Sequence, residues 1–288
     1  MEKIVVTGAT GFIGRYVIGQ LSGAGDRNYK IVATSPHPEK AIAAPWYDRV
    51  TYVPFDLSEA GSGEDLYRYF GRPDRLIHLA WEGLPNYKSD FHLEVNYPRH
   101  LAFLKNMADH GLMDITVTGT CLEYGMQEGC LKEDMETHPH NSYAKAKDLL
   151  RASLQALQKD RVFTLKWVRL FYMYGKGQNP NSLLSQLDKV LEQRTPVFNM
   201  SGGEQVRDYL PVEKVASCIV QTALQKRVTG VINCCSGRPV RIKDFVQEYL
   251  RQKRREVRLN LGYYPYPDYE PMHFWGDTEK LNKIMKDE

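Results

Sequence analysis

The sequence lacks long apolar runs. No stretch approaches the roughly 18 consecutive apolar residues that a membrane-spanning helix needs. The amino terminus also lacks a secretory pattern, because Glu2 and Lys3 lead directly into the short run Ile4–Val6 and then into glycines. The sequence therefore predicts no membrane span, and we expect a cytoplasmic protein.

Cysteine and positive charge are also sparse. There are five cysteines, no Cys-x-x-Cys pair and no His/Cys/Asp spacing typical of a metal site. Cys234 and Cys235 are adjacent, which rarely permits a relaxed disulfide, so we expect free thiols in a reducing compartment. The net charge is only +3, and the one tight basic cluster, 253–255, is typical of a solvated helix end. We expect no metal and no nucleic-acid partner.

Short apolar runs alternate with helical patterns through the first half of the chain. Apolar residues three or four positions apart indicate helices, as in the segment that contains Leu93, Tyr97, Leu101 and Leu104. Alternating strands and helices predict an α/β fold, a Rossmann-type doubly wound parallel sheet covered on both faces. The expected strands are 3–7, 30–34, 50–55, 75–80, 114–118 and 163–170, and the first helix is 12–22.

After Tyr174 the pattern changes. We expect helices at 182–193, 212–224 and 242–253 and a strand at 230–234. Segment 262–271 holds four tyrosines and three prolines, which predicts irregular structure. The expected organisation is a dinucleotide-binding domain of residues 1–173, to which 204–229 return, and a smaller C-terminal substrate-binding lobe of 174–203 and 230–288.

Three glycines occupy the turn between the first strand and the first helix, within Thr7–Gly14. Gly8 permits a tight turn, Gly11 lets the backbone approach a pyrophosphate, and Gly14 lets the helix pack closely on the sheet. Free N–H groups at the helix start would then face the phosphates. Because the pattern directly follows an N-terminal strand, it favours a dinucleotide site over a purely structural turn.

The end of the second strand lacks the acid that usually binds the ribose hydroxyls of NAD. Residues 33–37 read Ala-Thr-Ser-Pro-His, and the first acid is Glu39. A carboxylate would repel a 2′-phosphate, whereas Ser35 and His37 would not, and Arg15 follows the glycine turn closely enough to help. This pattern favours NADP(H), with NAD(H) held by other contacts as the alternative.

Tyr143 and Lys147 form a Tyr-x-x-x-Lys pair on a predicted helix, where residues four apart share one face. A nearby ammonium favours the phenolate and would lower the tyrosine pKa from about 10. The alternative is an ordinary surface pair. Thr120 supports the catalytic interpretation, because its hydroxyl follows the fifth strand, where an open α/β sheet places its ligand. Ser142 is expected to cap the helix.

In these motifs and their order the sequence resembles the extended short-chain dehydrogenase/reductases, the NAD(P)-dependent epimerase/dehydratase family that acts on nucleotide sugars. The matching segments span nearly the whole chain: Thr7–Gly14, Asp56 in Phe-Asp-Leu, His78-Leu79-Ala80, Asn96, Thr120 with Tyr124-Gly125, Tyr143 with Lys147, Arg169 with Tyr174-Gly175, and Arg207-Asp208-Tyr209.

The resemblance implies a nucleotide-sugar substrate and a set of roles. Asp56 would contact the adenine, and Arg207 would reach the nucleotide or diphosphate of the substrate. The implied cofactor-binding residues are Gly8, Thr10, Gly11, Phe12, Ile13, Gly14, Ser35, Asp56, Leu57, Leu79, Ala80, Asn96, Tyr143 and Lys147. The implied substrate-binding residues are Thr120, Cys121, Tyr172, Asn181 and Arg207.

The residues after Thr120 separate members of the family. Related sugar 4,6-dehydratases carry Thr-Asp-Glu there, and Leu122 in place of the glutamate cannot move a proton. Segment 118–125 instead resembles reductases of nucleotide-linked 4-keto-6-deoxyhexoses. We therefore expect NAD(P)H-dependent reduction, with hydride added to C4, Tyr143 as proton donor and Thr120 steadying the oxygen. A nucleotide-sugar 4-epimerase and a non-catalytic NADP-binding sensor are the alternatives.

Two positions depart from the family's pattern. Tyr172 stands where the family usually has Asn, and segment 269–273 lacks the arginine often found in the C-terminal substrate region. The pocket is therefore expected to differ from that of the relatives, with more of the diphosphate binding left to Arg207.

Apolar faces on two helices imply a homodimer, as in the resembling family. Packing of these faces inside one subunit is the alternative. The residues concerned are Leu93, Leu101 and Leu104 on one helix, and Leu149, Leu150, Leu154 and Leu157 on the other.

Overall fold

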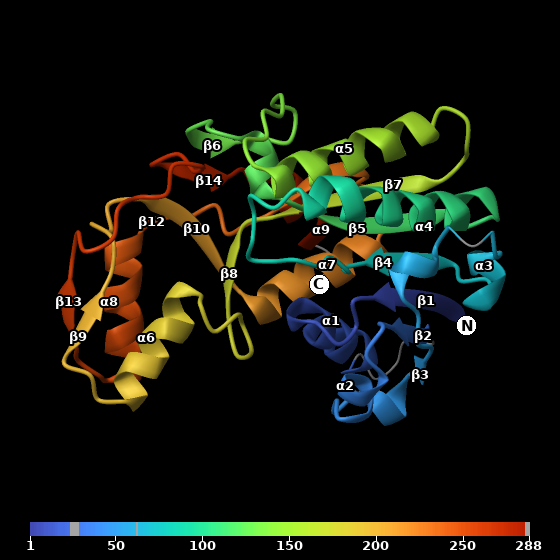
Figure 1. Ribbon diagram of the computed structural model, residues 1–288. Helices are drawn as coiled ribbons and strands as arrows, with labels where there is room; N and C mark the ends of the chain where they lie inside the picture. The colour runs from blue at the N-terminus through green and yellow to red at the C-terminus, as the bar shows by residue number, and fades with distance from the viewer. Residues whose placement is uncertain (24–28, 62, 286–288) are drawn as a thin grey trace.

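A seven-stranded, fully parallel sheet forms the centre of the protein in the computed structural model, which describes residues 1–23, 29–61 and 63–285 (Figure 1). The strand order is β11-β7-β5-β4-β1-β2-β3. The order reverses between β1 and β4, which makes their carboxyl ends the topological switch point of a Rossmann-type α/β fold. The strands are β1 (Glu2–Thr7), β2 (Tyr29–Thr34), β3 (Thr51–Tyr52), β4 (Arg75–His78), β5 (Asp114–Thr120), β7 (Thr164–Leu170) and β11 (Gly230–Cys234).

Helices cover both faces of this sheet. In β1, Ile4 and Val6 pack into one core and Val5 into the other, because successive strand residues face opposite sides. The first face is covered by α1 (Phe12–Gly23), α2 (Pro38–Ile42), α7 (Val212–Leu224) and α9 (Glu279–Met285). The second is covered by α3 (Leu66–Tyr69), α4 (Tyr97–Asp109) and α5 (Ser142–Leu157). Both faces of the sheet are therefore shielded from solvent.

A smaller lobe lies at the far end of the molecule from β2 and β3 (Figure 1). Its core joins α6 (Leu183–Glu192), α8 (Ile242–Lys253), β9 (Val197–Asn199) and β13 (Arg258–Asn260). Two short sheets link it to the larger lobe: β8 (Tyr172–Tyr174) with β10 (Val206–Pro211) and β12 (Pro239–Arg241), and β6 (Gly129–Leu131) with β14 (Phe274–Gly276).

The chain divides between the lobes differently from the expected boundaries. Strand β11, expected in the smaller lobe, pairs with β7 at the edge of the seven-stranded sheet. Strand β10, within the segment expected to return to the large lobe, pairs instead with β8 and β12. The reason for the first difference is that β11 is a buried apolar strand whose backbone groups complete the parallel ladder beside β7.

The predicted elements of the sheet are present with small differences. Strand β3 is much shorter than the expected 50–55, although Val53 and Phe55 beyond its end still donate backbone hydrogen bonds to Ala33 and Ser35. Segment 262–271 is irregular, as predicted. Short helical turns at 47–49, 57–59 and 121–124 were not predicted.

None of the helices within the described ranges combines the length and apolar character that crossing a membrane requires.

Candidate active site

A continuous cleft opens at the carboxyl ends of β1 and β4. It consists of a larger cavity of about 440 Å³ and a smaller cavity of about 190 Å³, which share Gly8, Gly11, Ala80 and Trp81 in their walls. Every residue of the predicted cofactor-binding set lines one cavity or the other. The structure thus brings these residues together where an open α/β sheet binds its ligand.

Two of the three glycines in the turn have the expected structural roles. Gly8 has φ +66°, and a Cβ there would lie 2.8 Å from the backbone nitrogen of Ala80. A Cβ on Gly14 would lie 2.9 Å from the Cα of Ala9, so a side chain would push α1 off the turn. The approach of the Gly11 backbone to a pyrophosphate stays a prediction.

The smaller cavity contains an unsatisfied polar group. The Thr34 hydroxyl is buried and has no hydrogen-bond partner among the described residues. Nearby, Ser35 Oγ lies 3.0 Å from the Tyr52 hydroxyl, and Asp56 accepts a 2.8 Å hydrogen bond from Ser58 N, which holds the pKa of Asp56 below its usual value. Buried polar groups are rarely left unpaired. Thr34, which the sequence analysis did not select, therefore fits a ligand hydroxyl such as that of a ribose.

Arg15 does not assist this cavity. Its guanidinium lies against the rings of Phe12 and Tyr16, and a Cβ on Gly177 would overlap it. The expectation that Arg15 helps to bind a 2′-phosphate is therefore wrong. The arginine that lines the smaller cavity is Arg99.

Lys147 is buried in the larger cavity. Its ammonium donates to the carbonyl of Thr118 at 2.9 Å and lies 4.0 Å from the ring centroid of Trp81. Burial lowers the pKa of Lys147 to about 7, although the charge of Glu123 raises it. Lys147 therefore titrates near neutral pH in the protein alone.

Tyr143 is also buried, with its ring beside those of Trp81 and Tyr87. Burial raises the pKa of Tyr143 above its ordinary value, and a hydrogen bond with Thr120 only partly offsets this. The expected lowering by Lys147 is therefore wrong for the protein alone. A neutral phenol is, however, the form that can donate a proton. The helix is capped by Asn141, whose Oδ1 accepts from Ala144 N at 2.9 Å, and not by Ser142.

Thr120 ends β5 and begins the turn 121–124. Its Oγ1 accepts from Leu122 N at 3.3 Å, and its own N–H donates to Glu123 Oε1 at 2.8 Å. Thr120 and Cys121 both line the larger cavity. Burial raises the pKa of the Cys121 thiol, so this side chain is a neutral wall group and not a thiolate.

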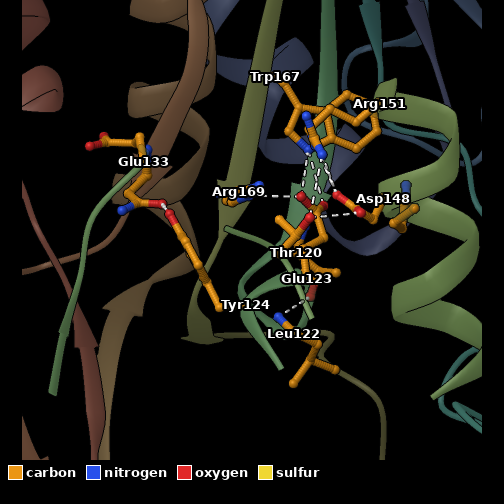
Figure 2. A network of polar contacts seen from close by, with 12 residues as sticks. Thr120, Leu122, Glu123, Tyr124, Glu133, Asp148, Arg151, Trp167 and Arg169 are labelled. Carbon is orange, nitrogen blue, oxygen red and sulfur yellow. Dashed lines mark hydrogen bonds and ion pairs between the residues drawn. The ribbon is translucent and has the colours of Figure 1, made fainter. Parts of the chain in front are cut away.

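A buried carboxylate behind Thr120 holds this region in place (Figure 2). Glu123 is fully buried and accepts hydrogen bonds from Arg169 Nε at 2.7 Å and from Trp167 Nε1 at 3.0 Å, in addition to the one from Thr120. A Cβ on Gly119 would lie 2.5 Å from the same carboxylate. Sequence reasoning missed Glu123, although Thr-x-x-Glu is the pattern of a capping box.

His78 contacts Thr7, the residue that precedes the glycine turn. It is buried, and its ring nitrogens lie 2.9 Å from Thr7 Oγ1 and 2.7 Å from His100 Nδ1, so it is a packed core histidine. Thr7 Oγ1 in turn accepts from the backbone of Leu79 and Ala80. This network connects β1 to the segment after β4.

The predicted substrate-binding set is only partly assembled. Tyr172 lines the larger cavity with Cys121 and Thr120. Asn181 is exposed and outside it, and Gln178 and Asn179 of the same loop take its place.

Arg207 is fully buried and lies outside the cavity wall, and its guanidinium is paired with Glu270 at 2.9 Å. In this position Arg207 does not reach the cavity, contrary to the expectation. Glu270 lines the cavity instead. Across the described ranges, no group of three or more His, Cys, Asp or Glu side chains is placed to hold a metal ion.

The doubly wound parallel sheet, with a tyrosine and a lysine buried beside its glycine turn, places the protein in the Rossmann-type α/β class. The chain belongs to the NAD dependent epimerase/dehydratase family, whose family model matches residues 4–235.

Three similar proteins illustrate its relationships. The chain is 29% identical to dTDP-6-deoxy-L-talose 4-dehydrogenase (NAD(+)) of Aggregatibacter actinomycetemcomitans, over 95% of this chain and 99% of that protein. It is 23% identical to GDP-6-deoxy-D-talose 4-dehydrogenase of the same organism, over 98% and 91%. Its fold matches the crystal structure of UDP-glucuronic acid 4-epimerase from Bacillus cereus in complex with UDP-glucuronic acid and NAD, with a TM-score of 0.84, 22% identity and coverage of 99% and 93%.

Proposed function

We propose that this protein interconverts a ketone and a hydroxyl at C4 of a nucleotide-linked 6-deoxyhexose, with reduction of the 4-keto sugar as its working direction. The observation that carries the proposal is the meeting of Thr120, Tyr143 and Lys147 in one cavity that continues onto the glycine turn. The names of the two similar 4-dehydrogenases support it, because they describe the same bond change on 6-deoxytaloses read in the opposite direction.

The residues present fit a nicotinamide dinucleotide, which when bound would supply the hydride. The glycine turn and the unpartnered Thr34 hydroxyl would hold its phosphates and a ribose, and Lys147 would donate to the other ribose. Tyr143, kept neutral by burial, holds the proton that an alkoxide at C4 needs. Thr120 donates a hydrogen bond to the same oxygen, and the Lys147 ammonium stabilises the phenolate left behind.

We infer NAD(H) as the dinucleotide, with NADP(H) as the second candidate. Arg15, which was expected to help bind the 2′-phosphate of NADP(H), instead packs against Phe12. The name of the 29% identical relative specifies NAD(+). The missing acid after β2 and the presence of Arg99 in the smaller cavity still favour NADP(H). Titration of both reduced forms decides: at least about tenfold tighter NADH binding is expected, and an equal margin for NADPH overturns the inference.

The activity is tested with dTDP-4-keto-6-deoxyglucose as substrate. We expect stoichiometric loss of absorbance at the reduced nicotinamide band. Isomerisation of a nucleotide sugar without net loss of reduced dinucleotide would identify a 4-epimerase instead. Tight dinucleotide binding with no chemistry on any nucleotide sugar would identify a sensor.

We also propose a homodimer through α4 and α5. Fewer of the leucines selected from the sequence are available for the contact, because several are buried within the subunit. Leu104, Leu150 and Leu154 are buried in their own subunit, whereas Leu149 is 44% exposed. A single-subunit mass in sedimentation at micromolar concentration would exclude the dimer.

A further inference from the structure

Glu270 forms part of the wall of the larger cavity on its substrate side. Among the described residues that line this cavity, it is the one that carries a carboxylate, and its side chain is 12% exposed. It lies in the irregular segment between β13 and β14, far from the catalytic residues in sequence. A carboxylate so largely removed from water needs partners or a bound ligand.

Arg207 holds Glu270 in place. Its Nη2 donates to Glu270 Oε2 at 2.9 Å, and its Nη1 donates to the carbonyls of Val206 and Met272 at 2.9 and 3.2 Å. The guanidinium also lies 4.6 Å from the ring centroid of Phe274. The cation is therefore engaged behind the carboxylate, and only Glu270 of this ion pair lines the cavity.

Tyr172 adds an unsatisfied hydroxyl to the same wall. Its ring packs against those of Tyr209 and Phe274, with centroids 5.5 and 6.1 Å apart. The hydroxyl oxygen is buried beside Glu270 and makes no hydrogen bond of regular geometry among the described residues. Burial and then the charge of Glu270 raise the pKa of Tyr172. A ligand that offers hydroxyl groups would satisfy both the phenol and the carboxylate.

This wall faces the space in which the reaction is proposed to occur. Burial, Tyr269 and Glu270 together raise the pKa of Tyr87 to about 12, and the Tyr87 ring lies 5.6 Å from that of Tyr143. The charge of Glu270 also acts on Cys121, the neighbour of Thr120. A sugar at Tyr143 would therefore lie within the electrostatic field of Glu270.

We propose that Glu270, positioned by Arg207, is a specificity-determining residue that binds neutral hydroxyl groups of the hexose together with Tyr172 and rejects sugars that carry a carboxylate. The inference rests on the proposed function, because it concerns the sugar in the same cavity. A desolvated carboxylate accepts hydrogen bonds from hydroxyls, whereas a second carboxylate beside it is repelled. The substrate class is then neutral nucleotide-linked hexoses, and nucleotide-linked uronic acids are excluded.

Calorimetric titration of the NAD-saturated protein with matched sugars tests this inference. UDP-glucose and UDP-glucuronic acid share a nucleotide and differ only at C6, and the dTDP pair repeats the comparison. We expect the neutral sugar to bind at least about tenfold more tightly than the uronic acid in each pair. Glu270→Gln should strengthen uronic acid binding and reduce that ratio about tenfold.

Two further variants complete the design. Asp268→Asn is the matched control, because Asp268 lies two residues away, is exposed and pairs with Lys88 outside the cavity; the ratio should not change. Tyr172→Phe should weaken neutral-sugar binding several-fold, the effect of one lost hydrogen bond, and leave the affinity for the free nucleoside diphosphate unchanged.

Several outcomes would overturn the inference. An unchanged ratio in Glu270→Gln would do so, as would equal affinity of the wild-type protein for both sugars, a result that needs no variant to fold. Equal strengthening of free UDP and of UDP-glucuronic acid in Glu270→Gln would show that the carboxylate acts by withholding Arg207 from the diphosphate. Binding with the expected ratio but no hydride transfer would remove the proposed function and leave this inference standing. If the protein binds no nucleotide sugar at all, both the proposed function and this inference are excluded.

Discussion

The two ends of the cleft are built in different ways. The glycine turn of the dinucleotide end uses backbone from one short stretch, where Gly8 and Gly14 permit approaches that a Cβ would block. Side chains from other segments, such as Thr34, Asp56 and Arg99, complete the wall around it. The substrate end uses side chains from distant segments, held by buried ion pairs of Glu123 with Arg169 and of Glu270 with Arg207. The comparison teaches that the glycine turn is specified by local sequence, whereas the substrate end exists only after the chain has folded.

The largest effect is expected at the substrate end. Tyr143→Phe removes the proton donor and should lower kcat by about 10²- to 10⁴-fold, the usual contribution of general acid catalysis. Dinucleotide affinity should stay within about twofold, because the glycine turn does not depend on the phenol. Steady-state kinetics and dinucleotide titration measure the two quantities; near-normal turnover would remove Tyr143 from its role.

The ion pair behind Thr120 is the next test. Glu123→Gln leaves the buried Arg169 without a counter-charge and should lower the free energy of unfolding by about 3 kcal/mol. Urea denaturation measures this change. The control is Glu136→Gln, because the Glu136 side chain is 89% exposed. This variant should change the free energy of unfolding by less than about 0.5 kcal/mol. Equal effects of the two variants would show that the buried pair does not hold this end together.

At the dinucleotide end, Gly8→Ala should weaken dinucleotide binding at least about tenfold and destabilise the fold by about 1–3 kcal/mol, because an alanine at this φ is strained and its Cβ meets Ala80. Gly19→Ala is the matched control, since Gly19 lies in α1 and a Cβ there meets no atom within 4 Å. It should stabilise the protein by about 0.5–1 kcal/mol. Dinucleotide binding by Gly8→Ala at the wild-type affinity would contradict the local construction of this end.

The effect that is smallest near neutral pH, and grows on acidification, concerns the histidines under the glycine turn. Burial lowers the pKa of His78 to about 3 and that of His100 below its usual value. The unfolded chain therefore binds protons below about pH 6.5 that the folded chain does not, so stability falls as the pH drops from 6.5 toward 3, by up to about 1.4 kcal/mol per pH unit for each histidine.

Unfolding free energies measured between pH 6.5 and 4.5 test this slope. His100→Asn should make it shallower, whereas His138→Gln should not, because His138 is 62% exposed. A slope that is the same in all three proteins would exclude the buried pair as its source.

Much of the fold was predictable from the sequence, because strand and helix periodicities are local. The glycine turn, the Tyr143–Lys147 pair and the position of Thr120 were predictable for the same reason: each is a short motif with a fixed place relative to a strand or helix. The boundary at β11 was not, since a five-residue apolar strand fits either lobe and only pairing with β7 decides between them.

The roles of individual side chains were harder to predict. Arg15 lies near the glycine turn in sequence, but its guanidinium packs against Phe12 and Tyr16. The pKa of Tyr143 depends on burial by residues from several segments, which outweighs the expected effect of Lys147. Thr34, Glu123 and Glu270 are ordinary polar residues in the sequence and become notable only when burial limits their partners.

The sequence by itself determined the doubly wound sheet, the site of the glycine turn and the family, because these depend on hydrophobic periods and on backbone freedom at single positions. Only the tertiary structure decided which charges are paired and which polar groups remain open to a ligand. The physical reason is that desolvation and ion pairing depend on distances between residues far apart in the chain, and no local pattern encodes those distances.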